Sequence, residues 1–282
     1  MKPDRAPTSA DGTVDDIERA HLKEPGDASH VMHRYDAPAE FTGLLRRFWI
    51  PVWSVPPGRN APQKVLQYPV CLLVVTDEYA RFYGVTSGLS TTTLTGDGWA
   101  VGVMCAPAAG HLIAGRSVAE HTDRSVDVAD VLGGDGAVLV NRVRAAMALG
   151  PRSTEAHRFA IAAYADVLRR FLPVDAEGEL VNRLVAFVET RSDITRVAQV
   201  SDAFGMSERA LQRLVHRRLG LTPKWLIQRR RLHEAADRLR DRTTTLAQVA
   251  AALGYADQPH FIRDFSRVTA MTPGEFANLH RR

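Results

Sequence analysis

The sequence predicts two domains of different fold class, an α+β domain in the N-terminal half and an all-α domain at the C-terminal end. Three observations lead to this prediction. Short β-branched and aromatic runs fill residues 31–133, helical periodicity dominates residues 174–282, and the two parts differ in charge. Residues 191–282 hold 17 Lys and Arg against 9 Asp and Glu, whereas residues 1–190 hold 19 against 23. This asymmetry suggests that only the C-terminal part meets a polyanion, although a solvated arginine-rich surface would explain it equally well.

The composition is that of an ordinary globular protein, with 45% hydrophobic and 24% charged residues among 282. The absence of any run of 18 apolar residues predicts that no segment spans a membrane. Residues 1–30 are polar and rich in Asp, Pro, Gly and Ala, which predicts a disordered tail and not a secretory signal. Two cysteines, Cys71 and Cys105, disfavour a disulfide scaffold and point to a cytoplasmic protein.

The N-terminal domain, expected over residues 31–173, begins with runs typical of strands. These runs predict a small, mostly antiparallel sheet or open barrel, and they cover residues 48–53, 64–76, 80–85, 89–94 and 99–105. Helices are expected over residues 107–114, 136–149 and 153–172. The last helix carries an apolar stripe of Phe159, Ala163, Val167 and Phe171. The stripe suggests homodimerisation, a hypothesis that a monomeric mass in light scattering at micromolar concentration would contradict.

The residues of the N-terminal domain do not form a recognisable catalytic pattern. Its histidines show no His-x-His pair of the kind that a metal-binding β-barrel requires, and no phosphate loop or nucleophile elbow occurs. We therefore expect no enzyme activity, no metal and no cofactor. Aromatic residues and one histidine are candidates for an effector pocket, although core packing would explain most of them equally well: Trp53, Tyr68, Tyr83, Trp99 and His111.

The C-terminal domain, expected over residues 174–282, contains an internal repeat. Residues 197–215 can be laid over residues 246–265, so that Gly205 matches Gly254 and Thr222 matches Thr272. Each copy has a short Ala-rich helix, a glycine, a few turn residues with a capping Ser or Asp, and an amphipathic helix. This order predicts a helix-turn-helix in each copy. The small Ala198 and Ala247 are expected to let the second helix of each unit cross closely.

The second copy shows how such a helix is built. Asp257 can cap the helix, and Pro259 then lies in the first turn, where its missing N–H has no partner to lose. Phe261 and Phe265 form a buried face, which leaves Gln258, Ile262 and Arg263 exposed near the helix N-terminus. A helix of this kind is suited to insertion into a groove.

The segment between the two copies, residues 221–240, predicts one long helix. Thr222 can cap it and Pro223 can open it. A rigid helix of roughly 30 Å suits the ~34 Å that separates consecutive major-groove faces of B-DNA. It carries three consecutive arginines, Arg229, Arg230 and Arg231, which point to different faces, so at least one is expected to brace the two units.

The C-terminal region resembles the DNA-binding domain of the AraC/XylS family of bacterial transcription regulators. The resemblance covers residues 178–282 and is carried by Leu211-Gln212-Arg213, Gly220, Thr222-Pro223, Ala247, Gly254-Tyr255, Asp257-Gln258, His260-Phe261, Arg263, Phe265 and Thr272-Pro273. It implies a seven-helix domain that places two recognition helices, about 207–218 and 257–269, in adjacent major grooves of promoter DNA. Residues 31–133 resemble an uncharacterised N-terminal domain of some such regulators, which implies effector binding or dimerisation.

One position departs from the family pattern. The family usually has glycine where this sequence has Ala270, as it does at Gly220 in the first copy. If the position requires a positive φ, alanine costs on the order of 1 kcal/mol there.

The exposed positions of the two recognition helices predict the contacts with DNA. Arginine pairs with guanine and glutamine with adenine, and isoleucine can contact the methyl group of thymine. The expected base contacts are Arg209, Gln212, Arg213, Gln258, Ile262 and Arg263, and the expected phosphate contacts are Ser207, His216, Arg217, Lys224 and His260. Pairing with an internal acid is the alternative for Arg213 and Arg263, and a surface or capping role is equally open for His216 and His260.

The sequence therefore predicts a sequence-specific transcription regulator, with promoter DNA as its partner, RNA polymerase as a further partner, an unidentified small-molecule effector, and homodimerisation. The first rival is a cysteine alkyl-acceptor or redox-sensing protein, acting through Cys71 or Cys105 and fused to DNA-binding units. The second rival is a protein that coats DNA without sequence preference, which the mixed Gln, Arg and Ile faces disfavour.

Overall fold

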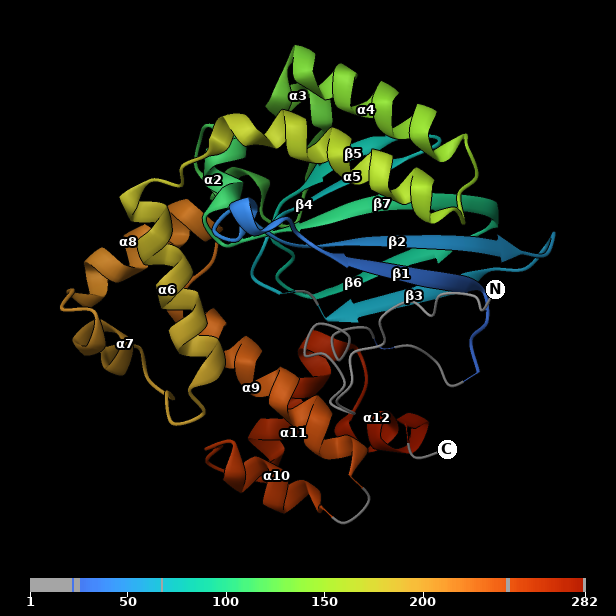
Figure 1. The fold of residues 1–282 in the computed structure, drawn as a ribbon. Helices are drawn as coiled ribbons and strands as arrows, with labels where there is room; N and C mark the ends of the chain where they lie inside the picture. The colour runs from blue at the N-terminus through green and yellow to red at the C-terminus, as the bar shows by residue number, and fades with distance from the viewer. Residues whose placement is uncertain (1–21, 23–25, 67, 242–243, 281–282) are drawn as a thin grey trace, which may run out of the picture.

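The computed structural model of the protein describes residues 22, 26–66, 68–241 and 244–280. Most of the tail predicted for residues 1–30 lies outside the described residues. A sheet-rich N-terminal part, with helices on one side of its larger sheet, is followed by a part built only of helices (Figure 1). The α+β and all-α classes predicted for the two parts are confirmed.

The N-terminal part contains two antiparallel sheets. The larger has the strand order β1-β2-β7-β4-β5-β8, and the smaller pairs β3 with β6. The strands are β1 (His30–Asp36), β2 (Leu45–Val55), β3 (Ala61–Leu66), β4 (Leu72–Thr76), β5 (Ala80–Tyr83), β6 (Leu89–Leu94), β7 (Gly96–Cys105) and β8 (Ser125–Asp127). The strand predicted over residues 64–76 is wrong, because β3 and β4 belong to different sheets. Pro69 lacks an N–H, and Val70 N donates to Tyr68 O at 2.8 Å, which closes a tight turn between the two strands.

Two strands were not predicted, and both lie at the edges of the larger sheet. β1 has a mixed polar sequence, HVMHRYD, because only part of each face is covered at an edge. β8 has three residues and, among the described strands, pairs with β5 alone. Neither has the continuous apolar run that identifies the central strands β4 and β7.

Two long helices cover one face of the larger sheet, and the β3–β6 pair lies on the other side (Figure 1). The helices of this part are α2 (Ala109–Ala114), α3 (Val128–Leu132), α4 (Gly134–Met147) and α5 (Thr154–Leu168), with short 3-10 helices η1 (Ala39–Phe41), η2 (Val118–His121) and η3 (Arg169–Phe171). Alternate residues of the central strands, such as Phe48 and Val103, pack under these helices. The buried Tyr164 of α5 donates from its hydroxyl to Val101 O at 2.7 Å, which ties the helix layer to β7.

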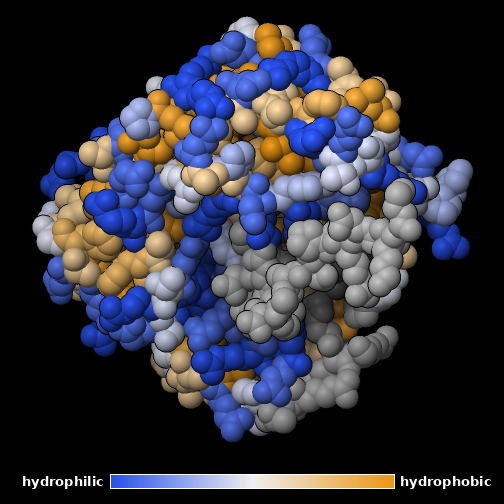
Figure 2. Space-filling model, viewed as in Figure 1, coloured by the Kyte–Doolittle hydropathy of each residue, from blue (hydrophilic) through white to orange (hydrophobic). Residues whose placement is uncertain are grey.

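The apolar stripe predicted to dimerise lies partly inside this layer. Ala163 and Val167 are buried in the core, whereas Phe159 is 44% exposed. Figure 2 shows hydrophobic residues on the surface of the α4–α5 layer, and Val138 and Leu149 are the other exposed large apolar residues near it. Core packing thus accounts for part of the stripe, and dimerisation stays a prediction.

The helices of the C-terminal part are α6 (Ala176–Thr190), α7 (Val197–Ala203), α8 (Glu208–Leu219), α9 (Pro223–Arg240), α10 (Leu246–Ala252), α11 (Gln258–Thr269) and α12 (Pro273–His280). Within the described residues these are the seven helices that the resemblance implies. The recognition helices predicted at about 207–218 and 257–269 correspond to α8 and α11. No helix in the described ranges is long and apolar enough to cross a membrane.

The N-terminal part packs against both helix-turn-helix units. The main core cluster runs from the sheet into the first unit, where it includes Leu211 and Val215. A second cluster surrounds Phe261 and Phe265 and includes Leu66 of β3. Each unit therefore has its own contact with the N-terminal part.

Candidate nucleic-acid interface

The turns of the two helix-turn-helix units have the same geometry. Gly205 and Gly254 both adopt a positive φ, at 61° and 70°. The residue after each glycine donates its N–H to the carbonyl five positions back, from Met206 to Ser201 and from Tyr255 to Ala250, at 3.0 Å in both units. The repeat predicted from the sequence is therefore present in the backbone.

The small residues that allow close packing are not those predicted. Ala198 and Ala247 are exposed, so the expectation that the second helix crosses over them is wrong. The buried small residues are Ser201 and Ala250, each three positions later in its helix. The prediction placed the packing face of these short helices nearly one turn too early.

In α8 the predicted base contacts lie on the exposed face. The Ser207 hydroxyl caps the helix by accepting from Ala210 N at 3.3 Å. The apolar residues Leu211, Leu214 and Val215 are buried, as predicted. The opposite face exposes three polar side chains to solvent: Arg209, Gln212 and Arg213.

In α11 the same arrangement recurs. The Asp257 carboxylate accepts from His260 N at 2.7 Å and so caps the helix. Phe261 and Phe265 are fully buried and contact each other in an edge-to-face arrangement. Arg263 is exposed, and Gln258 and Ile262 are partly exposed on the same side.

Among the described residues, the arginines predicted to contact bases have no internal partner. Within the part of the chain that the structure describes, no hydrogen bond or ion pair engages the side chains of Arg209, Arg213 or Arg263. The alternative that Arg213 and Arg263 pair with internal acids is therefore not supported. Their guanidinium groups, each with five N–H donors, are available to an external acceptor.

The residues predicted to contact phosphates fall into two groups. His216 and Lys224 are exposed. Arg217 forms an ion pair with Glu177 at the start of α6, and His260 Nε2 lies 3.8 Å from Asp264 Oδ2. A phosphate would have to compete with Glu177 for Arg217.

The helix α9 is braced to both units, as predicted for its arginines. Arg230 Nη2 donates to Ile194 O, next to the first unit, at 2.9 Å. The guanidinium of Arg231 lies 3.7 Å from the centroid of the Tyr255 ring in the second unit. Eighteen residues span about 27 Å, which is near the spacing of successive major-groove faces.

Ala270 ends α11 with φ 57° and ψ 20°, and Gly220 ends α8 with φ 70° and ψ 14°. The left-handed conformation is unfavourable for alanine because of its Cβ. Ala270→Gly should therefore raise the free energy of unfolding by about 1 kcal/mol, measured by urea denaturation. The matched control is Ala251→Gly in α10, which should lower it by a similar amount, about 1 kcal/mol, since this alanine is helical. Equal signs for the two variants would contradict the assignment of strain to Ala270.

The C-terminal end of α8 is docked on the N-terminal domain. Thr122, which follows η2, donates its hydroxyl to Gly220 O at 2.9 Å. The Ser117 hydroxyl donates to Arg217 O at 3.4 Å, and Trp225 Nε1 donates to Ser87 O at 3.1 Å. These hydrogen bonds join the C-terminal end of α8 and the start of α9 to the N-terminal domain.

Arg218 of α8 is buried against the start of α6, within the C-terminal part, and no sequence pattern pointed to it. Its side chain is 4% exposed and forms ion pairs with Asp175 and Glu177. The hydrogen bond from Arg218 lowers the pKa of Asp175. Burial would raise the pKa of Glu177, but hydrogen bonds from Arg218 and Arg217 outweigh it and lower the pKa. α8 contains several arginines, and nothing in the sequence distinguishes Arg218 from the exposed ones.

The five residues predicted for an effector pocket do not converge on one place. Trp53 and Tyr83 line a cavity of about 210 Å³ between the two sheets. Trp99 is buried on the other face of β7, within the main core. Tyr68 lines a different cavity, and His111 lies next to Arg218, where burial and then the Arg218 charge lower its pKa.

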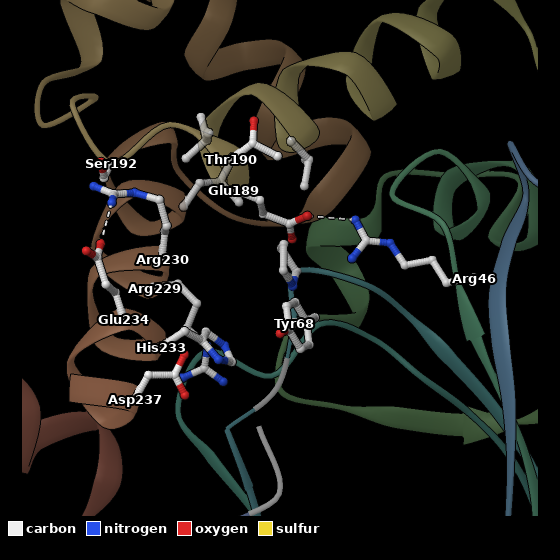
Figure 3. A pocket seen from close by; sticks show the side chains of 14 residues that line it. Arg46, Tyr68, Glu189, Thr190, Ser192, Arg229, Arg230, His233, Glu234 and Asp237 are labelled. Carbon is white, nitrogen blue, oxygen red and sulfur yellow. Dashed lines mark hydrogen bonds and ion pairs between the residues drawn. The ribbon is translucent and has the colours of Figure 1, made fainter. Parts of the chain in front are cut away.

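The cavity that Tyr68 lines lies between the domains and has a volume of about 520 Å³ (Figure 3). The Tyr68 ring is stacked on His233 of α9, with the ring centroids 4.6 Å apart. Two ion pairs form among its lining residues. Arg46 of β2 pairs with Glu189 of α6 at 3.0 Å, and Arg230 pairs with Glu234 within α9 at 2.9 Å. Three acidic residues among its lining residues, Glu189, Glu234 and Asp237, offset its cationic side chains.

The cysteines have no features of a reactive site. Cys71 and Cys105 are free thiols, and both are buried. Burial raises the pKa of Cys71 to about 12 and that of Cys105 well above its ordinary value. The thiolate is the nucleophile in alkyl transfer and thiol oxidation, so this environment disfavours the cysteine-based rival function.

Two family models match separate parts of the chain. Residues 200–278 match a model described as a helix-turn-helix domain. Residues 33–127 match a model described as a domain of unknown function (DUF6597). The first match covers both α8 and α11, and the second covers the strands β2 to β8.

Among curated proteins, the chain is similar to the HTH-type transcriptional activator RhaS. The protein from Escherichia fergusonii is 31% identical over 96 residues, which are 34% of this chain and 34% of that protein. RhaS from Pectobacterium carotovorum is 27% identical over 99 residues. The chain therefore aligns with about a third of the length of these relatives.

Among solved structures, the chain is similar to a transcriptional regulator with an AraC-type DNA-binding domain from Chromobacterium violaceum. That likeness covers 35% of this chain and 89% of the other, at 24% identity and a TM-score of 0.33. ToxT from Vibrio cholerae O395 is matched over 90% of this chain and 98% of its own, at 13% identity and a TM-score of 0.38.

Proposed function

We propose that this chain is a transcription regulator of the AraC/XylS type, and that it binds promoter DNA sequence-specifically through α8 and α11. The observation that carries the proposal is the pair of matched helix faces. The outer face of α8 carries arginine and glutamine, and the outer face of α11 carries arginine, glutamine and isoleucine. The apolar side of each helix is buried. Two such faces braced on one ~27 Å helix suit two successive major grooves.

In this proposal six residues on the outer faces of the two helices contact base edges. Arg209, Gln212 and Arg213 act from α8, and Gln258, Ile262 and Arg263 act from α11. Arginine donates two hydrogen bonds to guanine, which discriminates against the other bases. Ser207, His216, Lys224 and His260 contact phosphates and set the position of the helices, and Arg217 joins them where DNA displaces Glu177.

The test is a titration of the purified protein against its own upstream DNA and against a scrambled duplex, across a salt series. A preference of roughly 10³-fold or more that persists as salt rises would support base recognition. Equal affinities that fall together with salt, with and without candidate effectors, would contradict the proposal and favour non-specific coating.

The arginines provide a sharper prediction. Arg213→Ala and Arg263→Ala should each weaken binding to the specific duplex by about 1–3 kcal/mol, since each loses a bidentate contact with a base. Binding to the scrambled duplex should change less. The matched control is Arg59→Ala, an exposed arginine between β2 and β3 of the N-terminal domain, which should leave both affinities unchanged. Gel-shift titrations with unchanged specific affinity in both variants would remove these residues from the base contacts.

The N-terminal domain is proposed to modulate DNA binding. Its contacts with the end of α8 support this role, because a change near η2 would be transmitted to the first recognition helix through these hydrogen bonds. A small-molecule effector, homodimerisation and contact with RNA polymerase are the remaining parts of the proposal. They are supported by the resemblance to that family and by the exposed apolar residues of the α4–α5 layer.

A further inference from the structure

The corner between α8 and α9, residues 220–225, differs from its counterpart in the second unit, residues 270–275. In the second unit the Glu275 carboxylate accepts from Thr272 N at 2.6 Å and from the Thr272 hydroxyl at 2.9 Å, and so closes a capping box. The matching residue of the first unit is Trp225, whose indole has a donor and no acceptor. The first unit therefore has no carboxylate at this position to close its own corner.

Trp225 instead contacts the N-terminal domain. Its Nε1 donates to Ser87 O, in the loop between β5 and β6, at 3.1 Å. Ser87 is in turn held by Asp123, which lies between η2 and β8. The two carboxylate oxygens of Asp123 accept from Ser87 N and from the Ser87 hydroxyl, each at 2.7 Å. The indole of the corner is thus linked to Asp123 through a single residue.

The other end of the corner is held by the residue next to Asp123. The Thr122 hydroxyl donates to Gly220 O at 2.9 Å, and a Cβ at Gly220 would overlap Thr122 Oγ1. The second unit has Ala270 at the matching position, and Ala270 is exposed to solvent. The contact with the N-terminal domain therefore explains both differences between the two corners. Glycine is required where Thr122 approaches, and tryptophan replaces the capping glutamate where Ser87 is reached.

The two loops that carry Ser87 and Asp123 are tightly joined. Asp123 N donates to Val85 O at 3.0 Å, and Gly84 N donates to Arg124 O at 3.0 Å. A Cβ at Gly84 would overlap a backbone carbonyl of the other loop, and Val85 is fully buried. A movement of the corner would require these packed loops to move with it.

From these contacts we propose that Thr122 and Asp123 clamp the corner and thereby set the spacing of the two recognition helices. α8 enters the corner and α9 leaves it toward the second unit, so the angle at the corner determines where α11 lies relative to α8. Thr122 and Asp123 are positioning residues, since they act through Gly220 and Trp225. The inference rests on the proposed function, because it concerns the separation of half-sites that the protein accepts. Each added base pair moves a half-site by about 3.4 Å and rotates it by about 35°.

The clamp is tested first without DNA, on the full-length protein labelled with 5-fluorotryptophan. The chain has four tryptophans, and Trp225→Phe identifies the fluorine resonance of Trp225. Asp123→Gly should shift this resonance, because both acceptors of Ser87 are lost while glycine tolerates the φ of 58°. Asp123→Asn should shift it less, since an amide can accept from Ser87 N and donate to the hydroxyl. The matched control is Asp77→Gly, an exposed aspartate between β4 and β5, which should leave the resonance unchanged.

The effect on DNA binding is measured by gel shift, once footprinting has located the two half-sites in the upstream duplex. Altered duplexes carry one base pair more or one fewer between the half-sites. The wild-type protein should bind these ~10-fold or more weakly than the original duplex. Asp123→Gly and Trp225→Phe should bind the original duplex more weakly and lose ~3-fold or less on the altered ones, because a released corner lets α11 follow the displaced half-site.

The controls separate positioning from general loss of structure. Asp123→Asn and Asp77→Gly should keep the wild-type dependence on spacing, and circular dichroism checks that each variant is folded. A residue that only stabilises the fold would lower the affinity for all duplexes alike and leave their ratio unchanged. Thus the ratio between duplexes, and not the affinity itself, reports on the clamp.

Several results would overturn the inference. They are a Trp225 resonance that Asp123→Gly does not move, a dependence on spacing that is the same in the wild-type protein and both variants, and a wild-type protein that binds all spacings equally. Specific binding of the original duplex by the wild-type protein, together with any of these, leaves the proposed function and removes the clamp. Without specific binding by the wild-type protein, the proposed function fails and the role in spacing fails with it. The fluorine resonance alone then decides whether Asp123 holds the corner.

Discussion

Gly220→Ala should lower the free energy of unfolding by about 2–4 kcal/mol, the largest effect expected of any single substitution considered for this protein. Two costs combine at this position. Gly220 has φ 70°, where a Cβ is unfavourable. A Cβ there would also overlap Thr122 Oγ1 and come within 3.1 Å of backbone atoms of Ala119 and Val118. The backbone around η2 cannot yield as a flexible side chain would, so the end of α8 must move.

Gly205→Ala is the matched control for this prediction. Gly205 has φ 61°, but a Cβ there meets no atom within 4 Å. Gly205→Ala should therefore lower the free energy of unfolding only by the cost of the backbone conformation, about 1 kcal/mol. Urea denaturation of both variants measures the difference. Equal losses would mean that the contact with η2 adds nothing, and would also weaken the proposed coupling between the N-terminal domain and α8.

Arg218→Met should lower the free energy of unfolding by about 2–3 kcal/mol. Removing one partner of a buried ion pair costs ~3–5 kcal/mol, and the cost here is reduced because the side chains of Asp175 and Glu177 are 48% and 36% exposed. Arg218 itself is 4% exposed, so water cannot replace it easily. Arg217→Met is the control. Its exposed pair with Glu177 should contribute less than ~1 kcal/mol.

The effect of Arg218→Met should depend on pH in a definite direction. Both Asp175 and Glu177 have pKa values below their ordinary ones in the folded protein. Their contribution to stability is therefore present above about pH 4 to 4.5 and is lost as pH falls through the folded pKa values. The difference between the wild-type protein and Arg218→Met should shrink below about pH 4. A difference that stays constant from pH 7 to pH 3 would show that packing, and not charge, accounts for Arg218.

Much of the C-terminal domain could be predicted because its signals are local. The Asp257 cap, the Phe261 and Phe265 face and the positive φ of Ala270 each depend on residues within a few positions of one another. The repeat supplied a second copy against which each inference could be compared. The error at Ala198 and Ala247 arose because a seven-residue helix is too short for its buried face to be located from periodicity alone.

The N-terminal domain was predicted less well because its strands pair over long distances. The division of residues 64–76 between two sheets depends on which strands pair, and no local pattern encodes that. The same holds for the aromatic pocket candidates. Trp53 and Trp99 are both aromatic strand residues, but only the pairing of β2 with β7 places them on opposite faces of the sheet.

The sequence by itself determined the two helix-turn-helix units, their caps, their buried faces and the side chains that they expose, because helices are specified by contacts three and four residues apart. The tertiary structure alone decided three other features. It buried Arg218 beside Asp175 and Glu177, placed Trp49 and Trp53 over Gly102 and Gly98, and docked Gly220 on Thr122, 98 positions away in the chain. Contacts between residues so far apart leave no periodic signal, since they form only when separately specified elements pack together.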